Sequence, residues 1–304
     1  MEQIRVKLPS GIELDVVDTG LPDGVSGPDA ETLIFLHGFP ESHRTWRNQI
    51  AHFQDRYRCV APDQRGYCGS SNPQEPAMYT IDKLMGDIAQ MADALDVGKF
   101  TLVGHDLGGV VAWAIALTGM LEGRLERLVV ANAPHPLIFS KLLYLNADQR
   151  GASQYVRAFR DPANDALVRE HGIGAILRKA LNWEGSTMMD PAEMATLLGD
   201  WSNPDTAIAM LNWYRAGLSE VPPMDAPYEL PADYAPPALP KVAVPTLVVW
   251  AMDDMALPPA NLDGLDELVD DLTLVKVEGC GHFVTWEAPE KFNAAMEEFL
   301  AESS

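Results

Sequence analysis

The sequence lacks the features that mark secreted, disulfide-bonded and membrane-spanning proteins. It has only three cysteines among 304 residues, Cys59, Cys68 and Cys280, and their spacing shows no pairs, which excludes a disulfide framework. No apolar run reaches the roughly 20 residues that a membrane-spanning helix needs. The opening segment MEQIRVKLPSG has no apolar stretch typical of a signal peptide. We therefore expect a cytoplasmic protein without a membrane partner.

Positive charge is also scarce. The 22 Lys and Arg residues face 44 Asp and Glu residues, and the net charge is −22. No cluster of basic residues is present, so we expect no nucleic-acid partner, because phosphate binding needs such clusters. Five of the histidines have no metal-ligand spacing (His43, His52, His105, His135 and His171). We expect neither a metal nor a cofactor, and the sequence leaves the oligomeric state open, a homodimer included.

Short apolar runs that alternate with helical patterns are what the chain does contain. A hairpin is expected at residues 4–8 and 12–17, and buried strands at residues 32–36, 58–61, 100–103 and 125–131. Helical periodicity falls between them at residues 80–95 and 107–117. Strands that alternate with helices predict an α/β fold with a mostly parallel central sheet flanked by helices.

The alternation is interrupted in the middle of the chain. It stops near Pro134 and resumes at Pro245, with strands expected at residues 246–250 and 272–277 and a last helix at residues 289–300. The intervening stretch has a mostly helical pattern and ends in the proline-rich segment VPPMDAPYELPADYAPPALP, which is typical of a semi-rigid connector. We predict a core made of residues 1–135 and 236–304, and a helical cap at residues 136–235.

A carboxylate stands between two glycines at the end of the strand expected at residues 100–103. The stretch Gly104-His105-Asp106-Leu107-Gly108 has the form G-x-D-x-G and lies between a strand and a helix. In such a turn small neighbours allow a strained bend, and the central side chain projects above the carboxyl ends of the strands, where α/β sheets bind ligands. Asp106 is therefore a candidate nucleophile; the alternative is that it only caps the following helix.

Three further motifs follow expected strands. They are His37-Gly38-Phe39-Pro40, Trp250-Ala251-Met252-Asp253-Asp254 and Gly279-Cys280-Gly281-His282. All four motifs together resemble those of the α/β-hydrolases, and the aspartate turn resembles the epoxide hydrolase and haloalkane dehalogenase branch. The resemblance implies an α/β-hydrolase fold with Asp106 as nucleophile, His282 as base and Asp254 as the acid that orients it, with Asp253 as the alternative acid.

An aspartate nucleophile limits the chemistry. A carboxylate that attacks a carbon bearing a leaving group forms an alkyl ester with the enzyme. Water activated by His282 then attacks the ester carbonyl of Asp106. The resemblance places the oxyanion hole at the backbone N–H groups of Phe39 and Leu107. Epoxides and carbon–halogen bonds are therefore the candidate substrates.

The helical insertion favours epoxides. The segment Leu211-Asn212-Trp213-Tyr214-Arg215 resembles the epoxide hydrolase cap segment whose tyrosine donates to the ring oxygen, and QYVRAF at residues 154–159 resembles the segment with a second tyrosine. The resemblance thus implies Tyr155 and Tyr214 as hydroxyl donors, and a small apolar epoxide hydrolysed to a vicinal diol.

Two alternatives remain. A haloalkane or haloacid dehalogenase would use the same nucleophile, but Leu107 stands where many dehalogenases have a halide-binding Trp. A ligand receptor built on a hydrolase fold would not need the triad and the tyrosine pair.

Overall fold

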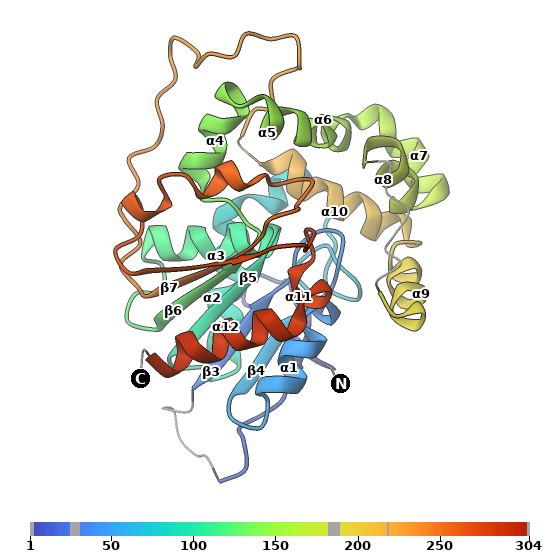
Figure 1. Ribbon diagram of the computed structural model, residues 1–304. Helices are drawn as coiled ribbons and strands as arrows, with labels where there is room; N and C mark the ends of the chain where they lie inside the picture. Colours follow the sequence, from blue (N-terminus) through green and yellow to red (C-terminus); the bar gives the residue numbers. More distant parts are fainter. Residues whose placement is uncertain (1–2, 25–30, 182–188, 218, 303–304) are drawn as a thin grey trace.

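The computed structural model describes residues 3–24, 31–181, 189–217 and 219–302. Figure 1 shows a central sheet with helices on both faces and a further group of helices beyond one end of the strands. Within the described residues no helix is both long and apolar enough to cross a bilayer.

The sheet has eight strands. They are β1 (Gln3–Lys7), β2 (Glu13–Asp18), β3 (Thr32–Leu36), β4 (Arg58–Pro62), β5 (Phe100–His105), β6 (Leu125–Ala131), β7 (Thr246–Ala251) and β8 (Leu272–Val277). Their order is β1-β2-β4-β3-β5-β6-β7-β8. The pairs β1–β2 and β2–β4 are antiparallel, and the other neighbours are parallel. The predicted α/β-hydrolase fold with a mostly parallel sheet is confirmed.

Helices cover both faces of the sheet. The helices outside the interval between β6 and β7 are α1 (Arg47–Phe53), α2 (Ile81–Ala94), α3 (Leu107–Thr118), α11 (Val284–Glu287) and α12 (Pro289–Glu302). One apolar cluster joins the sheet to α2 and α3, and a second joins it to α1 and α12. Strands β3, β5 and β7 are buried at every residue because both of their faces are covered.

The described residues between β6 and β7 form seven α-helices, at the end of the sheet where β5 meets α3 (Figure 1). They are α4 (Pro136–Leu145), α5 (Ala147–Ala152), α6 (Gln154–Arg160), α7 (Asp165–His171), α8 (Ile173–Leu181), α9 (Pro191–Asp200) and α10 (Pro204–Ala216). Residues 219–241 contain neither helix nor strand. The division into a core and a cap at residues 135 and 236 stays a prediction.

Short 3-10 helices complete the described elements. They are η1 (His43–Trp46), η2 (Pro76–Tyr79), η3 (Pro162–Asn164), η4 (Pro259–Leu262) and η5 (Leu265–Glu267).

The strand register brings distant loops together. Leu36 of β3 pairs with Gly104 of β5, and Ala131 of β6 pairs with both His105 and Val249. The segments that follow β3, β5, β6 and β7 therefore begin at the same edge of the sheet, where parallel α/β sheets form their sites.

Candidate active site

Asp106 occupies a strained turn between β5 and α3. Its backbone has φ 49° and ψ −122°, a region that residues other than glycine rarely adopt. Its side chain makes no capping hydrogen bond to α3, which argues against the capping alternative. The glycines permit close backbone contact: a Cβ on Gly104 would lie 2.6 Å from the Gly108 carbonyl oxygen. The turn thus presents a carboxylate that does not stabilise its own helix.

The two carboxylate oxygens of Asp106 have different neighbours. The Phe39 N–H donates to Oδ1 at 2.8 Å, and Nε2 of His282 lies 3.6 Å from Oδ2. A Cβ on Gly38 would lie 2.4 Å from the Cβ of Asp106, so glycine is required where this loop passes the turn. The role of the Leu107 N–H stays a prediction, because no hydrogen bond from it to Asp106 is found among the described residues.

Asp254 is the carboxylate that contacts His282. Its Oδ2 lies 2.7 Å from Nδ1 of His282, and its side chain is fully buried. Its Oδ1 accepts hydrogen bonds from the backbone N–H groups of Ala256 at 2.8 Å and Leu257 at 3.1 Å. Asp253, the alternative acid, is exposed to solvent. Asp106, His282 and Asp254 therefore form one chain of contacts.

The charges of this chain favour an ion pair at rest. Burial by itself lowers the pKa of His282, but the adjacent charges of Asp254 and Asp106 outweigh it and hold that pKa well above its ordinary value. Burial likewise opposes the charge on Asp106, yet His282 keeps the pKa of this carboxyl below its usual range. Asp106 is thus ionised and His282 protonated at neutral pH.

Two further residues hold the chain of Asp106, His282 and Asp254 in place, and neither has a role predicted from the sequence. Asn132, in the left-handed region at φ 39°, donates from Nδ2 to Asp254 Oδ2 at 2.7 Å and accepts from the Ala251 N–H at 2.9 Å. His105 Nε2 lies 2.9 Å from the His282 carbonyl oxygen, and burial lowers its pKa to about 4. A neutral His105 therefore donates from Nε2. The sequence feature that could have indicated Asn132 is its position as a polar residue immediately after a buried strand.

The two tyrosines predicted from the helical insertion lie together. Tyr155 of α6 and Tyr214 of α10 have ring centroids 5.9 Å apart, with an interplanar angle of 81°. The Tyr214 ring also contacts the rings of Phe39 and Phe159, at centroid distances of 5.1 and 5.0 Å. Burial, reinforced by the charge of Asp106, raises the pKa of both tyrosines. Both therefore keep their hydroxyl protons at neutral pH.

Asp106, Tyr155 and Tyr214 line one pocket of about 610 Å³. Most of its other lining side chains are apolar, and Leu107 and Trp213 are among them. Trp213 is fixed by a hydrogen bond from its Nε1 to the Arg65 carbonyl oxygen at 2.8 Å. Within the described part of the chain, no group of three His, Cys, Asp or Glu residues is placed to hold a metal ion.

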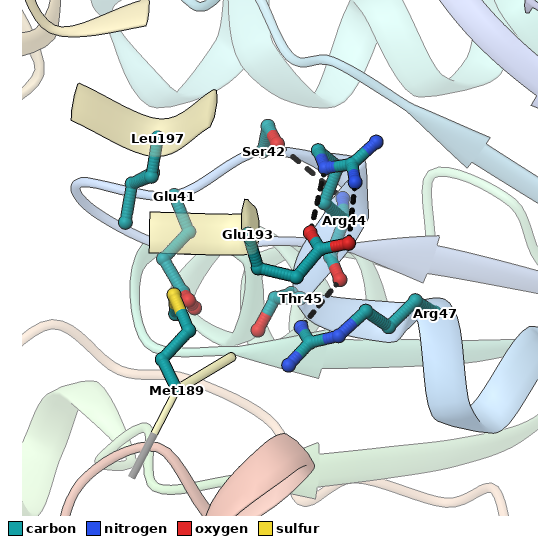
Figure 2. Close-up of a pocket in the computed structure, with 8 residues that line it drawn as sticks. All are labelled: Glu41, Ser42, Arg44, Thr45, Arg47, Met189, Glu193 and Leu197. Carbon is teal, nitrogen blue, oxygen red and sulfur yellow. Dashed lines mark hydrogen bonds and ion pairs between the residues drawn. The ribbon is translucent and has the colours of Figure 1, made fainter. Parts of the chain in front are cut away.

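Figure 2 shows a smaller hollow where η1 meets α9. Arg44 makes a bidentate ion pair with Glu193 there, with Nε–Oε2 at 2.8 Å and Nη2–Oε1 at 2.5 Å. Glu41, in the same hollow, is only 3% exposed; its Oε1 accepts from Trp286 Nε1 at 2.8 Å, and burial raises its pKa to about 7. None of the predicted catalytic residues lines this hollow.

Comparison with known proteins agrees with the geometry. Residues 31–289 match the family model of the alpha/beta hydrolase fold. The chain is 28% identical over 290 residues to Epoxide hydrolase 2 of Caenorhabditis elegans, a match that covers 91% of this chain and 76% of that protein.

Solved structures are similar over nearly the whole chain. One comes from work on novel epoxide hydrolases of the alpha/beta hydrolase superfamily in metagenomes from hot environments; it is 60% identical, has a TM-score of 0.93, and the match covers 99% of this chain and 98% of that one. The epoxide hydrolase of Bacillus megaterium in complex with an inhibitor is 26% identical with a TM-score of 0.82, and the match covers 98% of this chain and 100% of that one.

Proposed function

Because the chain belongs to the alpha/beta hydrolase family and is an epoxide hydrolase, we propose that it opens its substrate through a covalent ester on Asp106. The observation that carries this mechanism is the pair of neighbours of the Asp106 carboxylate. One oxygen accepts the Phe39 N–H, and the other faces His282.

In the first step Oδ2 of Asp106 attacks a ring carbon of the epoxide. The bond from that carbon to the ring oxygen breaks, and the oxygen takes a proton from the hydroxyl of Tyr155 or Tyr214. Both tyrosines line the pocket with Asp106, and their raised pKa values keep them protonated until the alkoxide forms. Oδ1 stays beside the Phe39 N–H as the carbonyl oxygen of the ester.

The second step hydrolyses the ester. Esterification removes the negative charge of Asp106, and with it one of the interactions that raise the pKa of His282. The imidazolium can then give its proton to the tyrosinate, directly or through water, and the neutral imidazole takes a proton from the attacking water, while Asp254 stabilises the imidazolium that forms again. Water attacks the carbonyl carbon of the ester, and the Phe39 N–H, joined by the Leu107 N–H, binds the oxyanion on Oδ1. Collapse of the tetrahedral intermediate breaks the bond from the carbonyl carbon to the diol oxygen, which takes the second proton of the attacking water. Release of the diol restores the Asp106 carboxylate and leaves His282 protonated, as it is at rest.

The substrate class that fits this site is an apolar epoxide, and the product is its vicinal diol. An apolar pocket with two hydroxyl donors supports a leaving oxygen that must be protonated, whereas a halide leaves without a proton. We also propose that the enzyme works in the cytoplasm, a proposal supported by its three free cysteines.

A single turnover in heavy-oxygen water tests the mechanism. The enzyme is mixed in excess with an epoxide, and the diol and the peptide that contains Asp106 are analysed by mass spectrometry. We expect label in the Asp106 carboxylate and none in the first diol, because water attacks the enzyme ester rather than the substrate carbon. Label in the first diol together with an unlabelled peptide would contradict the covalent step.

The matched control is Asp106→Ala, for which we expect an unchanged circular dichroism spectrum and no turnover. Release of halide from haloalkanes without diol formation from any epoxide would identify a dehalogenase instead.

A further inference from the structure

The pocket continues from Asp106 along one face of α3, well past the reacting atoms. Six residues of this helix line it, namely Leu107, Val110, Val111, Ala114, Leu117 and Thr118. Their spacing of three and four places them on one face of the helix. Eleven steps from Leu107 to Thr118, at about 1.5 Å each, make this wall about 16 Å long. A small epoxide ring beside Asp106 would leave most of that length empty.

The opposite wall comes from the start of α2. Ile81, Leu84 and Met85 line the same pocket, and α2 lies beside α3 in Figure 1. Between Asp106 and the far end, the side chains of both walls are aliphatic or thioether groups. Such a channel gains free energy by enclosing hydrocarbon and offers few hydrogen bonds to a polar chain.

The part of the channel lining that is exposed to solvent is polar and negative. Asp82 and Thr118 both line the pocket and are exposed to solvent. The Thr118 hydroxyl donates to the Ala114 carbonyl oxygen at 2.7 Å, and the Thr80 hydroxyl lowers the pKa of Asp82, which is therefore charged at neutral pH. A carboxylate at the end of a substrate arm would meet this charge.

The described lining residues include one basic side chain, but it does not reverse the preference of the channel for an uncharged substrate arm. It is Arg160, which belongs to α6 rather than to the channel walls. Its guanidinium donates to the backbone carbonyl oxygens of Tyr214, Ser219 and Gly217 at 2.7, 2.7 and 3.1 Å.

We propose that the channel between α2 and α3 binds a long, uncharged aliphatic substituent of the epoxide, so that long-chain alkyl epoxides are the preferred substrate class. The inference rests on the proposed function, because the channel begins at the nucleophile. Each methylene group that the channel fully encloses raises kcat/KM by about fourfold. Ala114 lies midway along α3, and its small side chain leaves the channel open.

The test is the dependence of kcat/KM on chain length for terminal alkyl epoxides from epoxybutane to epoxydodecane. In the unaltered enzyme we expect kcat/KM to rise by at least about tenfold over the series. In Ala114→Leu, we expect epoxybutane to keep its rate within about twofold and epoxydodecane to lose about tenfold or more. Ala116→Leu, the same change on the same helix at a residue that does not line the pocket, should keep the original profile.

A comparison of charged and uncharged substrates tests the effect of the negative charge of Asp82. An epoxide whose arm ends in a carboxylate should have a lower kcat/KM than the methyl ester of the same compound. In Asp82→Asn, this difference in kcat/KM should be smaller.

Each result separates this inference from the function on which it rests. Turnover of short epoxides with no dependence on chain length in the unaltered enzyme would overturn the inference and leave the proposed function intact. Equal losses for short and long substrates in Ala114→Leu, or the same loss in Ala116→Leu, would also overturn it. Absence of turnover for every epoxide would overturn the proposed function itself. Because the first profile needs no substitution, the inference stays testable even if Ala114→Leu does not fold.

Discussion

At the scale of single residues, the site depends on side chains whose surroundings set their protonation. The negative charge of Asp106 and the positive charge of His282 stabilise each other. In the mechanism that we propose, esterification removes the charge of Asp106 and allows His282 to act as a base. Tyr214 is only 8% exposed and is held by the rings of Phe39 and Phe159, so its hydroxyl is fixed before substrate binds. Proton donation from a fixed hydroxyl is expected to contribute mainly to ring opening.

Tyr214→Phe tests this contribution. The ring and its aromatic contacts are kept, while the donor is lost, so we expect the alkylation rate constant to fall by about 10²-fold or more with little change in the melting temperature. Rapid-quench measurement of the ester intermediate separates alkylation from hydrolysis. Tyr155→Phe is the matched variant on α6; alkylation at the original rate in both variants would contradict the role of the pair.

At the scale of elements, the close approach of α3 to β3 positions Asp106, the proposed nucleophile. A Cβ on Gly108 would lie 2.2 Å from the Leu36 carbonyl oxygen and 2.5 Å from that of His37. Both are backbone atoms of β3 or of the loop after it, so they cannot rotate away. The same loop carries the Phe39 N–H that contacts Asp106. Packing of the helix against the strand is therefore coupled to the contact between the Phe39 N–H and Asp106, which belongs to the proposed oxyanion hole.

Gly108→Ala is expected to force α3 and β3 apart. We expect the free energy of unfolding to fall by about 1–3 kcal/mol and activity to fall further than stability explains, because Phe39 and Asp106 separate. Urea denaturation and kcat/KM measure the two effects.

Gly86→Ala on α2 is the control for Gly108→Ala. Its Cβ would meet only the end of the Gln90 side chain at 3.6 Å, and alanine stabilises a helix interior by about 0.5–1 kcal/mol relative to glycine. A Gly108→Ala enzyme as stable and active as the Gly86→Ala enzyme would contradict the coupling.

At the scale of the whole molecule, the helices between β6 and β7 are joined to the rest of the chain by side-chain contacts. They include the Arg44–Glu193 ion pair and the Trp213 hydrogen bond to Arg65. They also include hydrogen bonds from Trp201 to the Pro40 carbonyl oxygen at 2.6 Å and from Asn212 to the Gln74 carbonyl oxygen at 2.9 Å. Glu41 is buried beside this junction, and its Oε2 has no hydrogen-bond partner within the described residues. The junction therefore contains a carboxyl group that resists ionisation.

Glu41 makes the stability of the whole molecule depend on pH. Its pKa of about 7 in the folded state exceeds the ordinary value of 4.5, so between these values the folded state binds more protons than the unfolded state. Its contribution to the free energy of unfolding therefore falls as the pH rises through this window. In Glu41→Gln this dependence is absent, and we expect the variant to match the unaltered enzyme near pH 4 and to exceed it by on the order of 3 kcal/mol above pH 7.

Urea denaturation of both proteins between pH 4 and pH 8 measures this difference. Glu298→Gln, at an exposed residue of α12, controls for the loss of one negative charge from a chain with a net charge of −22. Parallel stability curves for Glu41→Gln and the unaltered enzyme would show that the pKa of Glu41 does not change on folding, and would contradict the prediction.

Local sequence by itself determined the order of strands and helices and the position of the candidate nucleophile. Apolar runs such as residues 32–36 and 246–250 have the length of a buried strand and are too short for a buried helix. Their alternation with helical segments predicts a parallel sheet. The glycines around Asp106 indicate a turn in which neighbouring backbone segments are too close together for a larger side chain. These inferences succeed because their physical cause lies within a few residues.

Tertiary structure alone decided which groups support the reacting atoms. Asn132 reaches Asp254 across 122 positions, and His105 reaches His282 across 177, because the strand order places their loops at one edge of the sheet. Burial distinguishes Asp254 from Asp253, although the two are adjacent in sequence. The pocket at Asp106 is lined by residues from α2, α3, α6 and α10, which are far apart in the sequence. Spacing along the chain does not predict such contacts, because they depend on how the helices and strands pack against one another.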